Sequence, residues 1–578
     1  MLDNILFGIN KPGRYIGQEW NVSRKDFDQA EIKFGLCFPD LYEVGMSNLG
    51  LRIIYGILNN ASGVVCERFF APAADLEKVL REQKCSIFSL ESQKNLRDFD
   101  LIGFSLGYEL CYTNVLNILD LGGIPLKASE RDASYPLIIG GGPSVLNPEP
   151  MHEFFDLFVI GEAEEVILEL IYRYKELRAS DKQGLLLELS KIEGVYVPSL
   201  YNVAYDLEGK ISSFEPKFIS VPAKIKKRFV QDFNQSYFPT QWLVPNIQVI
   251  HDRITLEIMR GCPNRCRFCQ AKAQYFPLRV RSKENLLNLA TQTYAATGYE
   301  EISLCGLSVS DHPQIEELLG SLIEYFKDKA VGISLPSIKP KDMVGNLAYL
   351  ISTIKKTGFT FAPEAGSEKM RNILGKDFDL DVFWQALKTA YLNGYQHVKL
   401  YFMIGLPLEE DKDLDSISDF IQEASELRRQ VSSRPAEVNI SINTLIPKPH
   451  TAFQWCGMQD LAGIKYKQDY LRAKINKRRF KLSFHNLQMS ILEGVFSRGD
   501  RRLSQVILAA FNKGARFDAW DEHFSFAKWE AAFNESGVDH NFYLKGRSLD
   551  EILPWDFLDI GINKDLLAAE FNKLIAIK

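Results

Sequence analysis

Residues Arg260-Gly-Cys-Pro-Asn-Arg-Cys-Arg-Phe-Cys-Gln270 place three cysteines, Cys262, Cys266 and Cys269, at C-x3-C-x2-C spacing near the middle of the 578-residue chain. A compact loop with three thiolates can hold three irons of a [4Fe–4S] cluster and leaves the fourth iron without a protein ligand. In catalytic metal sites, an open position of this kind binds a substrate or cofactor. The spacing therefore predicts a cluster that takes part in chemistry, with these cysteines as its catalytic and metal-binding residues.

Two other interpretations of the three cysteines stay open. A structural zinc site needs a fourth ligand and favours paired C-x2-C motifs, and the nearby His251 precedes the whole strand that leads into the loop. Alternatively, the thiols pack in a core, which suits a loop of proline, asparagine and arginine poorly. Cys305 and Cys456 lie outside the loop and are interpreted as packing thiols.

The residues that follow the loop predict a partial barrel. One strand, 254–259, leads directly into the cysteines, and further apolar runs alternate with helical patterns. The predicted strands are 254–259, 301–305, 331–335, 359–362, 398–403 and 438–443, with helices over 284–296, 315–326, 342–355, 382–393 and 414–428. Six strand–helix units favour a (β/α)6 partial barrel, in which function lies at the C-terminal ends of the strands.

Glycine, proline and polar residues follow each of these strands and are candidates for the site. After the cysteines they are Gly306 and Ser308, Pro336 and Ser337, Glu364, Gly405, and finally Lys448 and His450. Each residue alone is compatible with ordinary loop structure. Because the six strand ends meet on one rim, we interpret them together as a site, with His450 as a candidate proton-transfer group.

The first third of the chain predicts a second parallel sheet. Five strands alternate with helices, near 32–38, 64–70, 100–105, 136–139 and 158–161. This order is typical of a doubly wound, Rossmann-like sheet, which binds ligands beyond the carboxyl ends of its strands. Ser105 and the run Gly140, Gly141 and Gly142 stand at two of those ends. A tight turn without a ligand explains the glycines equally well.

The remaining segments are less informative. Residues 172–250 are interpreted as a connector with a small hairpin. Its charge run of Lys224, Lys226, Lys227 and Arg228 is interpreted as a solvated face, with a nucleic-acid contact as the alternative. Residues 459–578 predict a mainly helical domain, and its basic stretch near 474–481 fits a solvated helix or, as the alternative, an RNA-contacting face. The elbow around Arg498 is expected to cap helices. The predicted domains are therefore 1–171, 172–250, 251–458 and 459–578.

Composition excludes several classes of protein. The chain is 46% hydrophobic and 25% charged, with a formal net charge of −6, so it has no global attraction to nucleic acid. No apolar run reaches the length of a membrane helix, and the N-terminus does not resemble a signal peptide. The nine cysteines, which are thinly spread outside the central three, suit a reducing compartment. We expect a cytoplasmic, oxygen-sensitive protein without a membrane partner.

The cysteine loop, with Phe268 before its last cysteine, resembles that of radical S-adenosylmethionine enzymes. The segments 334–337, 361–366, 399–407 and 446–451 are similar to those of an uncharacterised subfamily with a cobalamin-binding-like N-terminal domain. The resemblance implies a [4Fe–4S] cluster, S-adenosylmethionine as cofactor, and a 5′-deoxyadenosyl radical. It also implies an external one-electron donor of the flavodoxin or ferredoxin type.

Residues of the cofactor site follow from the same resemblance. Those implied for S-adenosylmethionine are Phe268, Gly306, Ser308, Glu364 and Gly405. Leu304-Cys305-Gly306-Leu307 stands where the family often has Gly-Gly-Glu, so the usual glutamate is missing. Arg279 and Arg281 could meet the cofactor carboxylate, a substrate anion or surface acids.

The N-terminal module resembles a cobalamin-binding domain over roughly residues 31–171. The resemblance implies Ser105, Gly140, Gly141 and Gly142 as cobalamin contacts. However, the chain has no D-x-H-x-x-G, so the usual histidine below cobalt is absent. The reaction implied is cobalamin-dependent methyl transfer to an unknown substrate. The alternatives are a methylthiolation-type enzyme that modifies tRNA or rRNA, and a non-catalytic iron–sulfur scaffold.

Overall fold

The N-terminal sheet in the computed structural model has the strand order β2-β1-β3-β4-β5-β6, and its first five strands are parallel. The structure describes residues 5–335, 339, 350, 359–376 and 378–576. The strands are β1 (Ile32–Phe38), β2 (Val64–Phe70), β3 (Leu101–Ser105), β4 (Leu137–Gly141), β5 (Leu157–Val159) and β6 (Val195–Tyr196). The five predicted strands are therefore confirmed, and β6 adds an antiparallel edge.

Helices alternate with the strands of this sheet, as expected for a doubly wound fold. They are α2 (Tyr42–Gly45), α3 (Leu49–Asn60), α4 (Ala74–Gln83), α5 (Tyr112–Leu121), α6 (Val166–Leu177) and α7 (Lys182–Leu189). Every residue of β2 is buried, including the charged Glu67 and Arg68 that interrupt its apolar residues. After β6, the chain forms the expected hairpin of β7 (Tyr201–Tyr205) and β8 (Ile211–Pro216). The short β9 (Ile225–Lys226) then pairs with β19 (Leu558–Asp559).

The central strands form two parallel sheets in the described part of the chain. The first contains β10 (Ile254–Glu257), β13 (Glu301–Cys305) and β14 (Gly332–Ser334), and the second β15 (Phe359–Glu364), β16 (His397–Ile404), β17 (Glu437–Thr444) and β18 (Lys481–Phe484). All six predicted strands are present, but a continuous barrel is not confirmed. Residues 336–338 and the predicted helix over 342–355 are not described, apart from Leu350.

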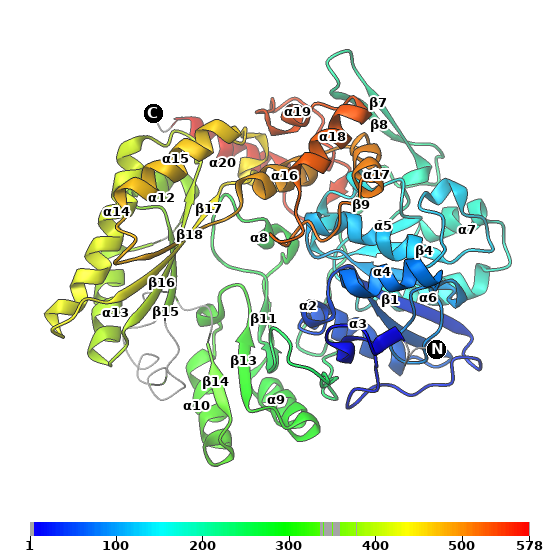
Figure 1. Ribbon diagram of the computed structural model, residues 1–578, viewed down its shortest axis with the longest axis horizontal. Coiled ribbons are helices and arrows are strands. Elements are labelled where there is room, and N and C mark those ends of the chain that lie inside the picture. Colours follow the sequence, from blue (N-terminus) through cyan, green and yellow to red (C-terminus); the bar gives the residue numbers. More distant parts are fainter. Residues whose placement is uncertain (1–4, 336–338, 340–349, 351–358, 377, 577–578) are drawn as a thin grey trace.

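Helices connect these strands, and smaller elements surround the cysteine loop. The helices are α9 (Lys283–Thr297), α10 (Ile315–Phe326), α12 (Glu368–Leu374), α13 (Leu380–Leu392) and α14 (Asp411–Glu426). The smaller elements are β11 (Met259–Arg260), β12 (Arg279–Val280) and α8 (Gln270–Gln274). Figure 1 shows α8 and β11 between the N-terminal module and the β15–β18 sheet. This position brings the cysteine loop near both halves of the molecule.

The last part of the chain is mainly helical, as expected. It contains α15 (Leu461–Lys474), α16 (Leu487–Arg498), α17 (Leu503–Asn512), α18 (Phe526–Ser536), α19 (His540–Leu544) and α20 (Lys564–Ala576). In Figure 1, α16 bridges from the β15–β18 side toward the N-terminal module, and α17 packs on α5. The strand β18 was not predicted and joins β17 in parallel.

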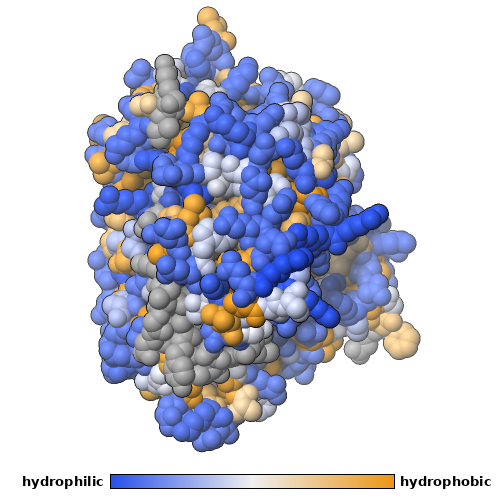
Figure 2. Space-filling view, turned by 90° about the vertical axis from the view of Figure 1, so that its left-hand side faces the viewer, coloured by the Kyte–Doolittle hydropathy of each residue, from blue (hydrophilic) through white to orange (hydrophobic). Residues whose placement is uncertain are grey.

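The outer face of the β15–β18 half is polar. Figure 2 shows this side mostly hydrophilic, with apolar residues in small scattered groups. Within the basic stretch, Lys474 pairs with Asp415 and Arg479 with Glu426, both acids of α14. Among the described helices, none has the length and apolar composition required to cross a bilayer.

Candidate functional site

The cysteine loop begins where β11 ends and leads directly into α8. Gly261 has φ +92°, and a Cβ at this position would lie 2.7 Å from the Cα of Leu278. Only glycine fits such a turn without a shift of the backbone. Cys269 is the residue before α8, so helix and loop are fixed in position together. The local fold thus delivers the three cysteines within one short, tightly turned segment.

A chain of polar contacts holds the front of the loop. The side-chain amide of Asn264 donates to the Cys262 Sγ at 3.1 Å and to the Ser308 hydroxyl at 3.3 Å. Ser308 donates in turn to Asp311 at 2.6 Å, and Lys339 binds the Asn264 oxygen at 2.9 Å. Ser308, which was predicted to contact the cofactor, is buried and supports Asn264 beside Cys262.

The three thiols are close enough to influence one another's ionisation. Burial raises the pKa of Cys266, against the opposing charge of Lys376, and the other two cysteines raise it further. Burial also raises the pKa of Cys269. Metal binding requires thiolates, and iron would replace their protons. A set of three thiols on one loop, half-buried and electrostatically coupled, fits the three-iron attachment expected for a [4Fe–4S] cluster.

A single-ion site is a different arrangement. The described residues contain no group of three His, Cys, Asp or Glu side chains placed to hold one metal ion.

Arg267 ties the loop to two helices. Its guanidinium donates to the carbonyls of Asn372 and Ile373, at the end of α12, at 2.6 and 3.2 Å. Its Nε donates to Glu570 of α20 at 2.8 Å. The loop backbone also binds α12, because the Arg267 amide donates to the carbonyl of Leu374. These contacts fix the loop against the β15–β18 half.

The other residues implied for the cofactor are dispersed around this half. Glu364 is in the left-handed region at φ +66°, and Lys376 lies 3.3 Å from its carboxylate. Burial raises the pKa of Glu364, and Lys376 opposes that rise. The amide of Gly405 donates to Glu409 at 2.8 Å. Phe268 packs, partly buried, against an apolar cluster that includes Met403.

A cavity of about 500 Å³ lies between the N-terminal sheet and the first central sheet. Its lining contains five of the predicted residues, Ser105, Gly140, Gly141, Gly142 and Gly306. Apolar side chains of β1, α3 and β4 cover the N-terminal side, and β11, the end of α8 and the end of β13 cover the other. Of the remaining predictions, the three cysteines, Phe268, Ser308, Glu364 and Gly405 are not among the described residues that line it.

Buried charges join the two walls of this cavity. Arg260 of β11 binds Glu257 with two nitrogens at 3.0 and 2.9 Å, and reaches Glu164 at 2.8 Å and Glu162 at 3.0 Å. Arg279 donates to both Glu162 oxygens at 2.6 and 2.8 Å. Arg279 is therefore engaged with an acid of the N-terminal module. The sequence shows the acids after one strand and the arginines after the cysteines, but it does not show that these residues pair.

One sequence interpretation, the solvated Lys227, is wrong in the structure, and another, the capping elbow around Arg498, is incomplete. Lys227 is not solvated, because only 3% of the residue is exposed. Its Nζ donates to the carbonyls of Ala273, Gln274 and Phe276, and burial lowers its pKa to about 8. Arg498 does more than cap a helix: it is fully buried, and burial lowers its pKa to about 9.

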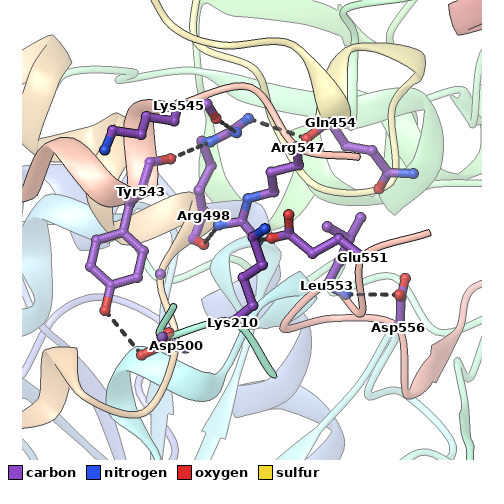
Figure 3. A network of polar contacts seen from close by, with 12 residues as sticks. Lys210, Gln454, Arg498, Asp500, Tyr543, Lys545, Arg547, Glu551, Leu553 and Asp556 are labelled. Carbon is purple, nitrogen blue, oxygen red and sulfur yellow. Dashed lines mark hydrogen bonds and ion pairs between the residues drawn. The ribbon is translucent and has the colours of Figure 1, made fainter. Parts of the chain in front are cut away.

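Arg498 is the centre of the network in Figure 3. Its guanidinium donates to the carbonyls of Tyr543 at 2.7 Å, Lys545 at 2.9 Å and Gln454 at 3.2 Å, and Arg547 donates to the Arg498 carbonyl at 2.6 Å. The contacts come from α16, from the end of α19 and from the loop after β17. The network therefore joins the C-terminal helices to the rim of the second central sheet.

His450 is buried beside that network. Its Nε2 lies 3.1 Å from the carbonyl of Leu146, which can only accept, so this nitrogen carries the proton. Burial lowers the pKa of His450 to about 4. Lys448 is likewise engaged, at 2.8 Å from both Glu109 and Glu493. Both residues after β17 thus connect the rim to the N-terminal module.

Comparison with known proteins gives consistent similarities. Two protein families match, one described as "Radical SAM proteins, N-terminal" over residues 50–198 and one as "Radical SAM superfamily" over residues 256–421. An uncharacterized protein of Methanocaldococcus jannaschii, MJ0966, is 29% identical over 486 residues, which cover 84% of this chain and 96% of that protein.

Two solved structures are also similar. The radical S-adenosylmethionine methyltransferase TsrM from Kitasatospora setae, with cobalamin and a [4Fe–4S] cluster bound, is 12% identical with a TM-score of 0.45, over 71% of this chain and 74% of that one. The cobalamin-dependent S-adenosylmethionine radical enzyme OxsB, with aqua-cobalamin and S-adenosylmethionine bound, is 14% identical with a TM-score of 0.48, over 94% and 79%.

Proposed function

The chain belongs to the radical S-adenosylmethionine superfamily and is therefore an enzyme, and from this premise we propose that it reductively cleaves S-adenosylmethionine and directs the radical to a second substrate. Membership implies a [4Fe–4S] cluster, S-adenosylmethionine and an external electron donor. When bound, the reduced cluster supplies the electron that splits the sulfonium into methionine and a 5′-deoxyadenosyl radical, which abstracts a hydrogen atom.

The observation that carries the proposal is the geometry of the cysteine loop. Cys262, Cys266 and Cys269 would hold three irons of the cluster, and Asn264 donates to the sulfur of Cys262. A hydrogen bond to a sulfur and a nearby cation both favour the thiolate form, and Lys376 supplies that charge near Cys266. Arg267 keeps the loop against α12 and α20. Phe268, Gly306, Ser308, Glu364 and Gly405 remain our candidates for contacts with S-adenosylmethionine.

We further propose that the cavity binds cobalamin and that the reaction is methyl transfer to an unactivated carbon. Support comes from the lining, where Ser105 and Gly140 to Gly142 face Gly306 across the cavity. A Cβ on Gly107 would meet nothing within 4 Å, and one on Gly141 only a carbonyl at 3.9 Å, so the sheet edge leaves room for a large flat group. The described lining includes no histidine, so the protein would hold cobalamin without that ligand.

RNA modification is the alternative proposal, with weaker support. The segment Pro447 to Thr451 resembles the matching stretch of RNA methylthiolating enzymes, but its Lys448 and His450 are engaged in internal contacts. We also propose that a flavodoxin or ferredoxin donates the electron and that the protein is cytoplasmic.

The decisive experiment measures 5′-deoxyadenosine. The protein is reconstituted anaerobically with iron and sulfide, reduced, and incubated with S-adenosylmethionine. We expect 5′-deoxyadenosine from the wild type and none above background from Cys266→Ala. The matched control is Cys456→Ala, a thiol outside the loop, which should retain product formation. A wild type that holds a full cluster but gives no 5′-deoxyadenosine contradicts the proposal.

A further inference from the structure

The side chain of Gln274 has an unusual position at the end of α8. The residue is 6% exposed and lines the cavity, and its Oε1 is buried with no hydrogen-bond partner among the residues described. A buried amide without a partner is unfavourable, and native proteins rarely retain one without a reason. Here the unpartnered group belongs to the wall of a space large enough for a ligand.

The backbone beneath this side chain is firmly held. The Nζ of Lys227 donates to the carbonyls of Ala273 and Gln274, at 2.9 and 3.1 Å, and to that of Phe276 at 2.8 Å. The end of α8 therefore cannot turn easily to bring the Gln274 amide to solvent. A fixed, desolvated polar group is the arrangement that provides specificity in a binding site, because no reorganisation precedes binding.

The rest of this wall disfavours anions. Arg260, the one cation among the described lining residues, already binds Glu257, Glu164 and Glu162 and has 7% of its side chain exposed. These carboxylates accept hydrogen bonds but offer none. A phosphate or carboxylate would thus meet acceptors and an occupied arginine. A neutral group with N–H donors would find partners.

We propose that Gln274 binds a primary carboxamide of the cavity's ligand, donating one hydrogen bond and accepting another. A glutamine amide and a ligand amide are complementary in this way, since each carries one carbonyl oxygen and an NH₂. The inference rests on the proposed function, because the periphery of cobalamin bears several primary amides. It adds that this wall recognises amide-bearing, uncharged edges and rejects their carboxylate counterparts.

The test compares binding in three versions of the full-length protein. Aquacobalamin is titrated into the wild type, Gln274→Met and Gln468→Met, with corrinoid absorption as the readout. Gln468 is the matched control, a 5% exposed glutamine of α15 that is remote from the cavity and bound to His485 and Arg472. We expect Gln274→Met to weaken binding about 5- to 50-fold, through loss of two hydrogen bonds. Gln468→Met should bind like the wild type.

A second titration tests the choice between amide and acid. The probe is a cobalamin monocarboxylate, in which one peripheral amide has been hydrolysed. The wild type should bind it more weakly than aquacobalamin for the isomer hydrolysed at the Gln274 contact, and Gln274→Met should lose that discrimination. Equal affinity of wild type and Gln274→Met for aquacobalamin overturns the inference while leaving the cobalamin proposal standing. No corrinoid binding by the wild type overturns both.

Unfolding without ligand separates a binding role from a structural one. An unpartnered amide contributes nothing to the unliganded fold, so Gln274→Met should unfold at the same temperature as the wild type or higher. Gln468→Met should unfold at a lower temperature, because it loses made hydrogen bonds. A fall for Gln274→Met as large as that for the control identifies Gln274 as a structural residue and contradicts the inference.

Discussion

At the scale of single residues, His450 shows how burial sets the protein's response to acid. Its pKa is lowered to about 4 by burial, whereas an unfolded histidine titrates near 6.5. Between these values only the unfolded state binds the proton, so the free energy of unfolding falls as pH decreases from about 6.5 to about 4. For one such group the loss is about 3 kcal/mol.

The corresponding variant is His450→Asn. Asparagine tolerates the left-handed backbone found here, φ +59°, and can donate to the Leu146 carbonyl. We expect its urea stability to decrease less than that of the wild type between pH 6.5 and 4. The exposed His397→Asn is the control and should follow the wild type. If His450 were the proton-transfer group, His450→Asn would also change the pH profile of 5′-deoxyadenosine formation or turnover. We expect that profile to stay the same.

At the scale of an element, Lys227 stabilises the C-terminal end of α8. Its three carbonyl acceptors would lose their partner in Lys227→Met, and the helix directly follows the cysteine loop. We expect a loss of about 1–3 kcal/mol in the free energy of unfolding at pH 7 and a lower iron content after reconstitution. Lys226→Met, which changes an adjacent lysine whose side chain is 61% exposed, should have little effect. Equal effects of the two would contradict this assignment.

At the scale of the whole molecule, Glu162 joins the N-terminal module to the central strands. Burial would raise its pKa, but the hydrogen bonds of Arg279 and the charge of Arg260 together lower it. Glu162→Ala leaves both arginines short of a buried partner, and we expect a loss of about 3–5 kcal/mol by urea unfolding. Glu165→Ala removes only an exposed ion pair with Arg228 and should change stability by less than about 1 kcal/mol. A small effect of Glu162→Ala would mean that the two parts are held together elsewhere.

The same scale shows what the amino-acid sequence can predict. Buried parallel strands such as β3 can be recognised from the sequence because nearly all of their residues are apolar, and the cysteines can be recognised because their spacing is local. The burial of Lys227 within a run of lysines depends on carbonyls 46 to 49 residues away and has no local signal. The pairing of Glu162 with Arg279, 117 residues apart, is of the same kind. The strand β18 was missed because its four residues follow a basic turn.

The packing of α17 on α5 has a consequence for how the protein is made. Nine of the ten residues of α5 are buried, and its Asn114 accepts from the amide of Phe517, 403 residues later, while Thr113 donates to Asp518. Ribosomes add about 5–20 residues per second, so roughly 20–80 s pass between the synthesis of α5 and that of the residues that cover it. During that interval its apolar side is open to water and to other nascent chains. We therefore expect the growing polypeptide to engage chaperones while α5 is uncovered.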